Sequence, residues 1–343
     1  MDKKKWIFTA AVVTALLLFF LILFWPKAQN MDTVGICYRE KTTEQNREER
    51  AALEGLLTEK GLKLTVVDAD GDQAKQLKLI GELAKQGCDS LIVEPVMSDA
   101  AQELLQALDA AGVPAVLINR RIDTALLTPY SKIAYIGVDP AEPGKLQAQM
   151  LTALSDGGDI NGDGVVSYML LQGPENHQDT AMWKESLEKT LAESGRETEQ
   201  ITAVCGDWTR ESGKKLCAQE IAKFGKDIEV VFCGNDQMAL GAIEAIADGG
   251  RTMNIDVYLY GIGGDQEALQ KTQERTLSGT VYTDPVVYRT AVVNTVLSQI
   301  KDEPVEKLQI IPYTTITEAN IAKYLTSVSR VIEPDDSETQ TNP

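Results

Sequence analysis

Residues 158–168, with the sequence GDINGDGVVSY, carry oxygen ligands at alternating positions. Asp159, Asn161 and Asp163 are followed directly by a glycine, as in the first half of an EF-hand calcium loop. A complete loop of that kind needs a bidentate glutamate at position 12, and that position is Leu170 here. The sequence alone leaves two interpretations open. The segment is either a polar turn of the kind that Asn, Asp and Gly favour, or a calcium site whose last ligand comes from elsewhere in the fold.

The other residue types argue against catalysis. The sequence contains no GxSxG elbow, no Walker sequence and no GxGxxG after the first apolar run. His177 is the single histidine, so a His-rich metal site is excluded, and none of the five cysteines belongs to a CxxC pair. A net charge of −18 disfavours nucleic acid as a partner, because phosphate binding needs a basic face. We therefore predict a protein that is not an enzyme and does not bind nucleic acid.

Strands and helices must alternate along the chain to position these residues. Amphipathic helices are predicted at 44–61 and 99–112, the second with Asp99 as its N-cap and Gly112 as its stop. Apolar runs predict strands at 33–38, 63–69, 90–95, 114–119, 133–138, 165–172, 200–205, 229–234, 257–262 and 279–283. Alternating strands and helices imply βαβ units. The fold class is therefore α/β, with two doubly wound lobes built on parallel sheets.

The N-terminus has the character of a membrane segment. Three lysines precede an uncharged run from Trp6 to Trp25, which at 20 residues is long enough to span a bilayer. The run is longer than the apolar core of a signal peptide. A small-x-small cleavage site before residue 29 would need a small residue at position 26, which is Pro26. We expect an uncleaved signal anchor with the rest of the chain outside the cytoplasm, and a cleaved signal is the alternative. The polar tail at 331–343 is expected to be disordered.

The order of these pieces resembles the type I periplasmic sugar-binding proteins, in particular the galactose/glucose-binding group. The resemblance covers roughly residues 33–328. It is carried by DINGDG followed by LLQGPENHQD, by DW, by IEVVFCGNDQMALGAIEAI and by GTVYTD. Such proteins have two lobes joined by a three-segment hinge, which implies crossings near Val138, Asp284 and Ile310. The domains expected are a segment at 1–30, an N-terminal lobe at 31–138 plus 285–310, a C-terminal lobe at 139–284 plus 311–330, and the tail at 331–343.

The resemblance also implies how the calcium loop is completed. In the family, the bidentate carboxylate comes from a distant strand, and the matching residue here is Glu229. The family's glutamine at the ninth loop position is Ser167, whose shorter side chain leaves room for a bridging water. The implied calcium ligands are Asp159, Asn161, Asp163, the carbonyl of Val165, Ser167 and Glu229.

The same resemblance implies a sugar site at the strand ends, where polar groups bind hydroxyls and an aromatic ring stacks on the sugar. The residues that match the family's ligand positions are Asn119, His177, Asp179, Trp208 and Asn235. Each has a plainer interpretation. A lone histidine in a loop is usually incidental, an asparagine before an apolar helix is often an N-cap, and a tryptophan often belongs to the core.

Other positions depart from the family's pattern. Trp183 stands where the family has an arginine, and it is the expected replacement for a lost stacking ring. Gly263 and Thr283 stand where the family has an aspartate and an asparagine. Arg39 and Arg120 fall near the expected cleft, where arginine suits a carboxylate or phosphate as well as a sugar; exposed rim arginines are the alternative. These changes predict altered sugar specificity.

The resemblance implies a monomeric, membrane-anchored solute-binding protein that faces the periplasm or the cell exterior. It would capture a galactose- or glucose-like or modified monosaccharide for an ABC permease. The alternative is a sugar sensor that presents its ligand-bound form to a histidine kinase or chemoreceptor. Transcription regulators share the fold, but they carry a DNA-binding segment where this chain has an apolar run, and the acidic charge disfavours DNA.

Overall fold

A computed structural model describes residues 31–42 and 44–325. The predicted membrane anchor between Trp6 and Trp25 and the predicted disordered tail at 331–343 lie outside the described residues. Among the helices of the described part, none has the length and apolar character needed to cross a membrane.

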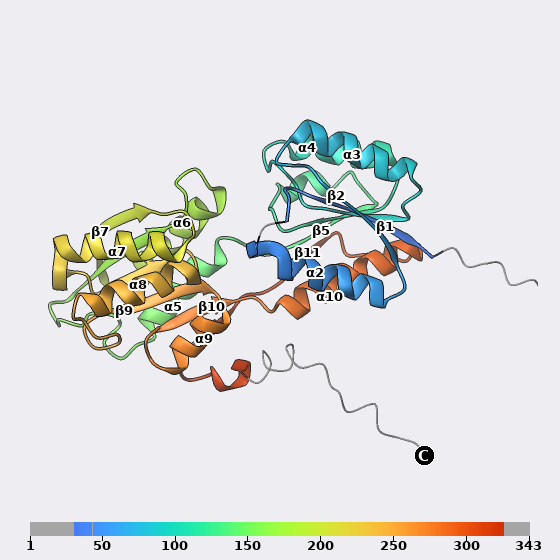
Figure 1. Ribbon diagram of the computed structural model, residues 1–343. Helices are drawn as coiled ribbons and strands as arrows, with labels where there is room; N and C mark the ends of the chain where they lie inside the picture. Colours follow the sequence, from blue (N-terminus) through green and yellow to red (C-terminus); the bar gives the residue numbers. More distant parts are fainter. Residues whose placement is uncertain (1–30, 43, 326–343) are drawn as a thin grey trace, which may run out of the picture.

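The N-terminal lobe is built on a parallel six-stranded sheet of order β11-β5-β4-β3-β1-β2 (Figure 1). Its two central strands are buried along their whole length, as expected for a parallel sheet covered on both faces. The strands are β1 (Thr33–Tyr38), β2 (Lys63–Asp68), β3 (Ser90–Val93), β4 (Ala115–Ile118), β5 (Ile133–Gly137) and β11 (Leu308–Ile310).

The C-terminal lobe repeats this plan with the order β12-β10-β9-β8-β6-β7. All its neighbouring pairs are parallel except β10 and β12, which are antiparallel. The strands are β6 (Val165–Gln172), β7 (Glu197–Cys205), β8 (Val230–Cys233), β9 (Tyr258–Gly263), β10 (Gly279–Tyr282) and β12 (Thr314–Ile316). The ten strands expected from the apolar runs are confirmed, each within a few residues of its predicted bounds.

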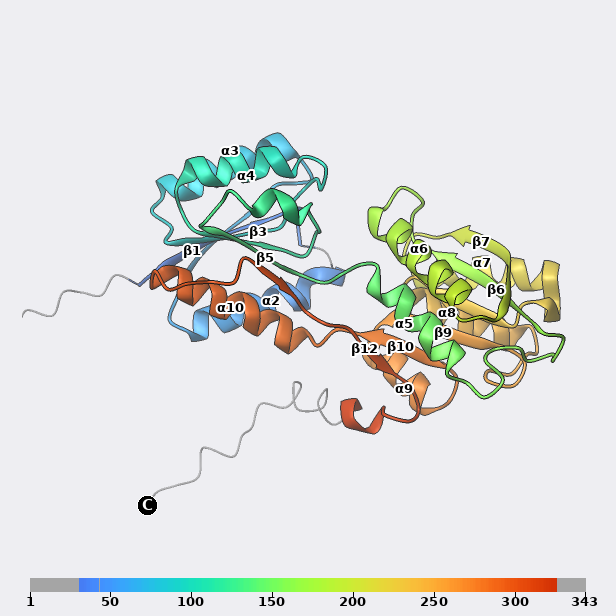
Figure 2. The same ribbon diagram turned by 180° about the vertical axis from the view of Figure 1, so that it is seen from behind.

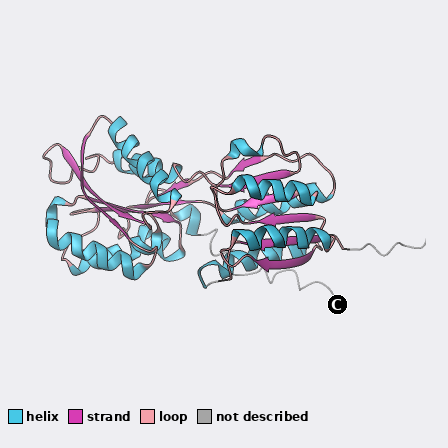
Figure 3. Cartoon of the chain, turned by 90° about the horizontal axis from the view of Figure 1, so that it is seen from above, coloured by secondary structure: helices cyan, strands magenta, loops and turns pink. Residues whose placement is uncertain are grey.

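Helices cover both faces of each sheet (Figure 3). The N-terminal lobe has α2 (Glu44–Glu59), α3 (Gln73–Lys85), α4 (Ala101–Ala111), the 3₁₀ helix η1 (Thr124–Leu127) and α10 (Pro285–Ile300). The C-terminal lobe has α5 (Glu142–Thr152), α6 (Gln178–Glu193), α7 (Arg210–Phe224), the 3₁₀ helix η2 (Gly225–Asp227), α8 (Asp236–Asp248) and α9 (Gln266–Gln273).

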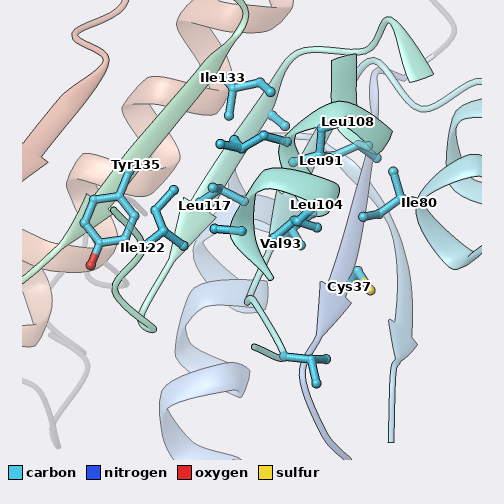
Figure 4. Packing of buried hydrophobic residues seen from close by; sticks show 14 of the residues in the cluster. Cys37, Ile80, Leu91, Val93, Leu104, Leu108, Leu117, Ile122, Ile133 and Tyr135 are labelled. Atoms are coloured by element: carbon cyan, nitrogen blue, oxygen red, sulfur yellow. The ribbon is translucent and has the colours of Figure 1, made fainter. Parts of the chain in front are cut away.

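Each sheet has two apolar cores, one on each face. In the N-terminal lobe, Leu104 and Leu108 of α4 pack with Ile80 of α3 on Leu91 and Leu117 of the sheet (Figure 4). Helices α2 and α10 cover the opposite face. In the C-terminal lobe, α7 and α8 pack on one face and α5 and α6 on the other. Each lobe therefore has a core of its own.

The start of α4 differs from the prediction. Gly112 ends the helix in the left-handed conformation, at φ 71°, as expected. The helix begins at Ala101, however, and the N-cap position is Ala100, which makes no side-chain capping bond. Asp99 therefore lies one residue too early to cap the helix, and that prediction is wrong. Helix ends shift by one or two residues easily, because the first turn has few intrahelical hydrogen bonds.

The chain passes between the sheets three times (Figure 2). The first passage follows β5 at Val138, the second follows β10 and leads into α10 through Asp284, and the third joins β11 to β12 through residues 311–313. Asp284 caps α10 by accepting hydrogen bonds from the backbone N–H groups of Val286 and Val287. Two lobes with separate cores, connected by three short chain segments, can move as units about these passages.

Candidate ligand-binding cleft

A pocket lies between the lobes, at the carboxyl ends of strands from both sheets. This is where open α/β sheets place their ligands. Its lining comes from both lobes and from the passages between them: Asn119, Arg121, Val138, Pro140, Pro143, Asp179, Thr180, Trp183, Trp208, Gly234, Ile262 and Tyr313. The pocket therefore contains four of the six residues expected in the ligand site.

A second hollow on the outer side of the C-terminal lobe is larger, at about 750 Å³ against about 120 Å³ for the pocket between the lobes. It lies between α5 and the edge of the sheet near β12, and its lining includes Tyr258, Arg275 and Thr315. It is away from the carboxyl ends of the strands. Position, and not size, identifies the pocket between the lobes as the candidate site.

Asn119 follows β4 directly and faces the pocket from the N-terminal lobe. Its backbone is left-handed, at φ 60°, which asparagine tolerates better than most residues. The Tyr288 hydroxyl accepts from the Asn119 backbone N–H at 2.8 Å and donates to the Asn119 Oδ1 atom at 2.9 Å. The Asn119 Nδ2 atom donates to Glu94 Oε1 at 3.3 Å. These contacts hold the amide at the mouth of the strand.

Trp208 faces the pocket from the C-terminal lobe, after β7. Its backbone has a positive φ of 71°, and the side-chain amide of Asn235 donates to its carbonyl at 2.9 Å. The indole lies against Gly173 and Gly234, where an added Cβ would come within 1.9 Å and 2.9 Å of ring atoms. Only glycine leaves room for the ring at these two strand ends. The two glycines therefore allow the indole to pack flat against the backbone and form an aromatic wall of the pocket.

Asn235 is the N-cap of α8, as in the plainer interpretation. Its Oδ1 atom accepts from the Met238 backbone N–H at 2.9 Å, while its Nδ2 atom holds Trp208. Asn235 does not line the pocket, although its neighbour Gly234 does. The structure therefore places Asn235 behind the aromatic wall.

His177 and Asp179 open α6 at the same end of the sheet. Asp179 lines the pocket, while His177 lies beside it, with its ring 5.9 Å from the Trp208 ring in an edge-to-face arrangement. The His177 Nδ1 atom is buried and has no hydrogen-bond partner among the described residues. It lies 3.9 Å from Asp179 Oδ2, which is too far for a hydrogen bond. The atom is therefore free to bond a ligand or a water.

Trp183 belongs mainly to the core. Its side chain is buried, with 4% exposed, and packs with Leu187 and Tyr168 between α6 and the sheet. Its Nε1 atom donates to Gln147 Oε1 at 2.7 Å. Trp183 also contributes to the pocket lining, so it forms the floor of the pocket and not a free stacking ring.

Several pocket residues were not anticipated from the sequence, and Arg121 and Tyr313 among them have large polar side chains. Arg121 extends from the N-terminal lobe and donates to Asp139 Oδ1 at 3.2 Å and to the Met182 sulfur at 3.7 Å. Tyr313 comes from the third passage, and burial raises the pKa of its hydroxyl, so it remains a neutral hydrogen-bonding group. The aromatic in IPYTT, just after the expected third crossing, was a usable signal for Tyr313. Arg121 offered no signal beyond its place next to Arg120.

Arg120 lies near the pocket without lining it. Its guanidinium donates to the carbonyl of Val96. Burial lowers its pKa, as does the positive charge of Arg39, while Asp179 raises it. Arg39 itself pairs with Glu40. These arginines are thus already engaged by oxygen atoms of the protein.

The family model of the periplasmic binding protein domain matches residues 35–304. The chain belongs to the periplasmic binding protein family. The resemblance inferred from the sequence motifs is thereby confirmed.

Two relatives and one solved structure illustrate the similarity. The D-galactose/methyl-galactoside binding periplasmic protein of Haemophilus influenzae is 29% identical over 77% of this chain and 83% of its own length. A putative rhizopine-binding protein of Rhizobium meliloti is 30% identical over 77% of this chain and 82% of its own. An ABC transporter solute binding protein from Bacillus halodurans, with bound myo-inositol, has a TM-score of 0.72 at 23% identity and covers 88% of this chain and 99% of that chain. The relatives are binding proteins, and this chain is a binding protein and not an enzyme.

In this periplasmic binding protein, a buried carboxylate organises the loop after β9. Asp236 Oδ2 accepts from the backbone N–H groups of Gly264 and Asp265, at 2.5 Å and 2.9 Å, and its Oδ1 accepts from the Thr280 hydroxyl at 2.7 Å. Burial raises the pKa of Asp236 to about 7, although the three hydrogen bonds that its carboxylate accepts act to lower it. Asp265, two residues after Gly263, accepts a hydrogen bond from the Gln237 side-chain amide at 2.7 Å.

The expected calcium loop packs against its expected last ligand. Glu229 is buried, with 1% exposed, and its carboxylate accepts from the backbone N–H groups of Asn161 and Ser167 at 2.9 Å and 3.0 Å. The Asp159 carboxylate accepts from Gly162 and Gly164, and Asp163 Oδ1 accepts from Val165. In the described part of the chain, no three acidic, histidine or cysteine side chains converge as a metal cluster. The residue types and the buried carboxylate of Glu229 fit a hard, oxygen-preferring ion such as calcium. In this structure the Asp159 and Asp163 carboxylates accept hydrogen bonds from backbone N–H groups of the loop itself.

Proposed function

We propose that this chain captures a monosaccharide, or a polyhydroxylated ring of similar size, between its two lobes. The observation that carries the proposal is the pocket between the lobes, which Asn119 of the N-terminal lobe lines together with Asp179 and Trp208 of the C-terminal lobe. Amide and carboxylate groups bond neighbouring hydroxyls, and an aromatic face covers C–H groups. The His177 Nδ1 atom, buried without a protein partner in the described residues, adds one more polar contact.

The relatives support this ligand class. One is named for D-galactose and methyl-galactoside, and another is a ribose import binding protein of Bacillus subtilis. Two solved structures of the same fold contain bound D-allose and bound myo-inositol. The pocket lacks the family's carboxylate at Gly263 and its asparagine at Thr283. We therefore infer a ligand with fewer, or differently placed, hydroxyls than galactose or glucose.

We further propose delivery of the ligand to an ABC permease from the outer surface of the membrane. The uncharged run between Trp6 and Trp25 supports retention as an anchor, and an anchored binding protein needs only to reach a neighbouring permease. Presentation of the closed form to a sensor kinase or chemoreceptor is the competing proposal. Stimulation of ATP hydrolysis by a reconstituted permease and its ATPase supports delivery; stimulation of kinase autophosphorylation supports sensing.

We also propose that the loop at 159–167 binds one calcium ion. Asp159, Asn161 and Asp163 would supply side-chain oxygens, with Ser167 at the ninth position through a water. The carbonyl of Val165 and the carboxylate of Glu229 would complete the shell. The ion would stabilise the C-terminal lobe by cross-linking the loop to the strand that follows Glu229.

Calorimetric titration tests the ligand proposal. The panel contains hexoses, pentoses, uronic acids, sugar phosphates and myo-inositol. We expect one class to bind, and Asp179→Ala to weaken its binding by roughly tenfold or more, because a hydroxyl loses a charged partner. Glu185→Ala is the matched control, since Glu185 is an exposed carboxylate on the same helix. Binding of an amino acid or peptide, and of no panel member, would overturn the proposal.

A further inference from the structure

Gln147 is a buried amide that connects three parts of the C-terminal lobe. It lies on α5 and is 0% exposed. Its Nε2 atom donates to the Cys233 carbonyl at 3.0 Å and to the Gly261 carbonyl at 3.1 Å. Its Oε1 atom accepts from the Trp183 indole Nε1 at 2.7 Å. One side chain thus joins β8, β9 and α6.

The two carbonyls that Gln147 bonds lie where the sheet opens. The ladder between β8 and β9 ends with the pair Phe232 and Tyr260. Cys233 and Gly261 are the next residues on the two strands, beyond that last pair. Their buried carbonyls need a donor, because an unpaired buried carbonyl loses its solvation without compensation. The two N–H bonds of one amide satisfy both, and so they fix the separation of the two strand ends.

The residues that follow these carbonyls are pocket residues. Gly234 comes after Cys233 and Ile262 comes after Gly261, and both line the pocket, as does Trp183. We propose that Gln147 is a positioning residue that sets three walls of the ligand pocket and thereby its selectivity among ring-shaped ligands. The selectivity part of this proposal rests on the proposed function.

A comparable amide in the other lobe separates positioning from simple stabilisation. Gln299 of α10 is also buried, with 7% exposed. Its Nε2 atom donates to the carbonyls of Ala115 and Lys132 at 3.0 Å and 3.4 Å, and its Oε1 atom accepts from the Ser90 hydroxyl at 2.8 Å. These residues stand at the amino ends of β3, β4 and β5, opposite the cleft. The Gln299→Met variant therefore removes similar hydrogen bonds far from the pocket.

The first experiment compares ligand selectivity. Gln147→Met and Gln299→Met keep the volume of the side chain and remove its amide. The affinities of the wild type and both variants are measured by calorimetry for the sugars and myo-inositol of the panel. We expect Gln147→Met to change the ratio of the two highest affinities by roughly tenfold and Gln299→Met to leave that ratio within about twofold. Equal changes in the two variants, or none in Gln147→Met, would overturn the selectivity role.

The second experiment needs no ligand. Hydrogen exchange is followed by NMR at the Trp183 indole N–H and at the backbone amides of Gly234 and Ile262. In Gln147→Met the Trp183 indole should exchange roughly a hundredfold faster than in the wild type, and both amides should also accelerate; in Gln299→Met all three should keep their wild-type rates. Unchanged exchange in Gln147→Met would show that the amide positions nothing.

Two outcomes are distinguished by this pair of experiments. If no panel member binds the wild type, the proposed function fails, while the exchange rates still decide whether Gln147 holds the pocket walls. If Gln147→Met does not fold, the side-chain amide protons of Gln147 are measured in the wild type. Slow exchange of both protons supports two lasting bonds to carbonyls, and exchange at the rate of a solvent-exposed amide overturns the proposal.

Discussion

At the scale of single residues, the pocket wall formed by Trp208 depends on the residues that support its ring. Trp208 is held by the amide of Asn235 from behind and by the bare backbone of Gly173 and Gly234 beneath its ring. The position of the Trp208 ring therefore depends on these three supporting residues as well as on the tryptophan side chain itself. Substitutions at the supports should alter binding without removing any group that contacts the sugar.

Gly173→Ala tests this dependence. An added Cβ would lie 1.9 Å from a Trp208 ring atom, so the indole must move. We expect affinity for the panel sugar to fall by roughly tenfold or more and stability to fall by about 1–3 kcal/mol. Gly55→Ala is the control, because a Cβ at Gly55 meets no atom within 4 Å and should stabilise α2 by about 0.5–1 kcal/mol. Calorimetry and thermal unfolding check both. An unchanged affinity in Gly173→Ala would mean that Trp208 is not a wall of the site.

Asp236 should give the protein a pH-dependent stability. Burial raises its folded-state pKa from 3.8 to about 7, so the folded state holds this proton more tightly than the unfolded state. The contribution of Asp236 is therefore most favourable below about pH 4 and is lost as pH rises towards 7, by on the order of 3 kcal/mol. In Asp236→Asn the group no longer titrates. The difference in free energy of unfolding between wild type and variant should decline from pH 4 to pH 7. A difference that is constant with pH would contradict the shifted pKa.

The strand-end residues of the site were accessible from the sequence, but the roles of several were not. Asn119 and Asp179 line the pocket, and the resemblance to the sugar-binding family implied both of them as ligand residues. The role of Arg121 could not be predicted, because its reach to Met182 joins segments 61 residues apart. The role of Gln147 could not be predicted either, because in the sequence it is one more polar residue on an amphipathic helix. Its hydrogen-bond partners lie on β8, β9 and α6, far from it in the chain.

At the scale of elements, the central strands were predictable because they are continuous apolar runs buried between helices, as in β3, β4 and β8. The edge strands β2 and β7 have no fully buried residue, and each was predictable from the apolar run it contains. The short strands β11 and β12 were not, since each has three residues and only Ile316 among them is buried. Strand β12 also runs antiparallel to β10, a direction set by the third passage and not by its own sequence. Pairing partners far apart in the chain decide such edge strands.

The loop at 159–167 and the residue before β8 form the element that tests the calcium proposal. We expect excess calcium, relative to excess chelator, to raise the melting temperature of the wild type, because an ion bound only by the folded state adds to its stability. Glu229→Gln should abolish most of this difference, since it removes a charge and a bidentate contact, while Ser167→Ala should reduce it less. The comparison is made on the calcium-dependent change and not on the melting temperature itself, because Glu229 also accepts two backbone hydrogen bonds. Equal melting temperatures with calcium and with chelator would leave the loop as a turn.

At the scale of the whole molecule, the predicted anchor would hold the cleft close to the membrane surface. We expect protein recovered from its native membrane to retain residues 1–30, since the apolar run is long and Pro26 lies at the cleavage motif. N-terminal sequencing or intact mass spectrometry reads this directly, with an alkaline carbonate wash to separate anchored from adsorbed protein. A mature chain that starts near residue 29 would contradict anchoring.

Closure of the lobes is the motion by which we expect ligand binding to become visible to a partner. Each lobe has its own core, and three short chain segments connect them, so the angle between the lobes can change without disturbing either core. A ligand that bonds Asn119 in one lobe and Asp179 in the other stabilises the closed arrangement over the open one, in proportion to the difference in its contacts.

Small-angle X-ray scattering should therefore show a smaller radius of gyration when the panel sugar saturates the wild type. Asp179→Ala should close less at the same fractional saturation, because the ligand then lacks its charged partner in the C-terminal lobe. Glu185→Ala, exposed on the outer part of the same helix, should close as the wild type does. Calorimetry sets the sugar concentrations so that the three proteins are compared at equal occupancy. If the sugar saturates the wild type and its radius of gyration does not change, ligand binding does not close the lobes, and a partner that recognises the bound form must detect the ligand or a local change at the cleft.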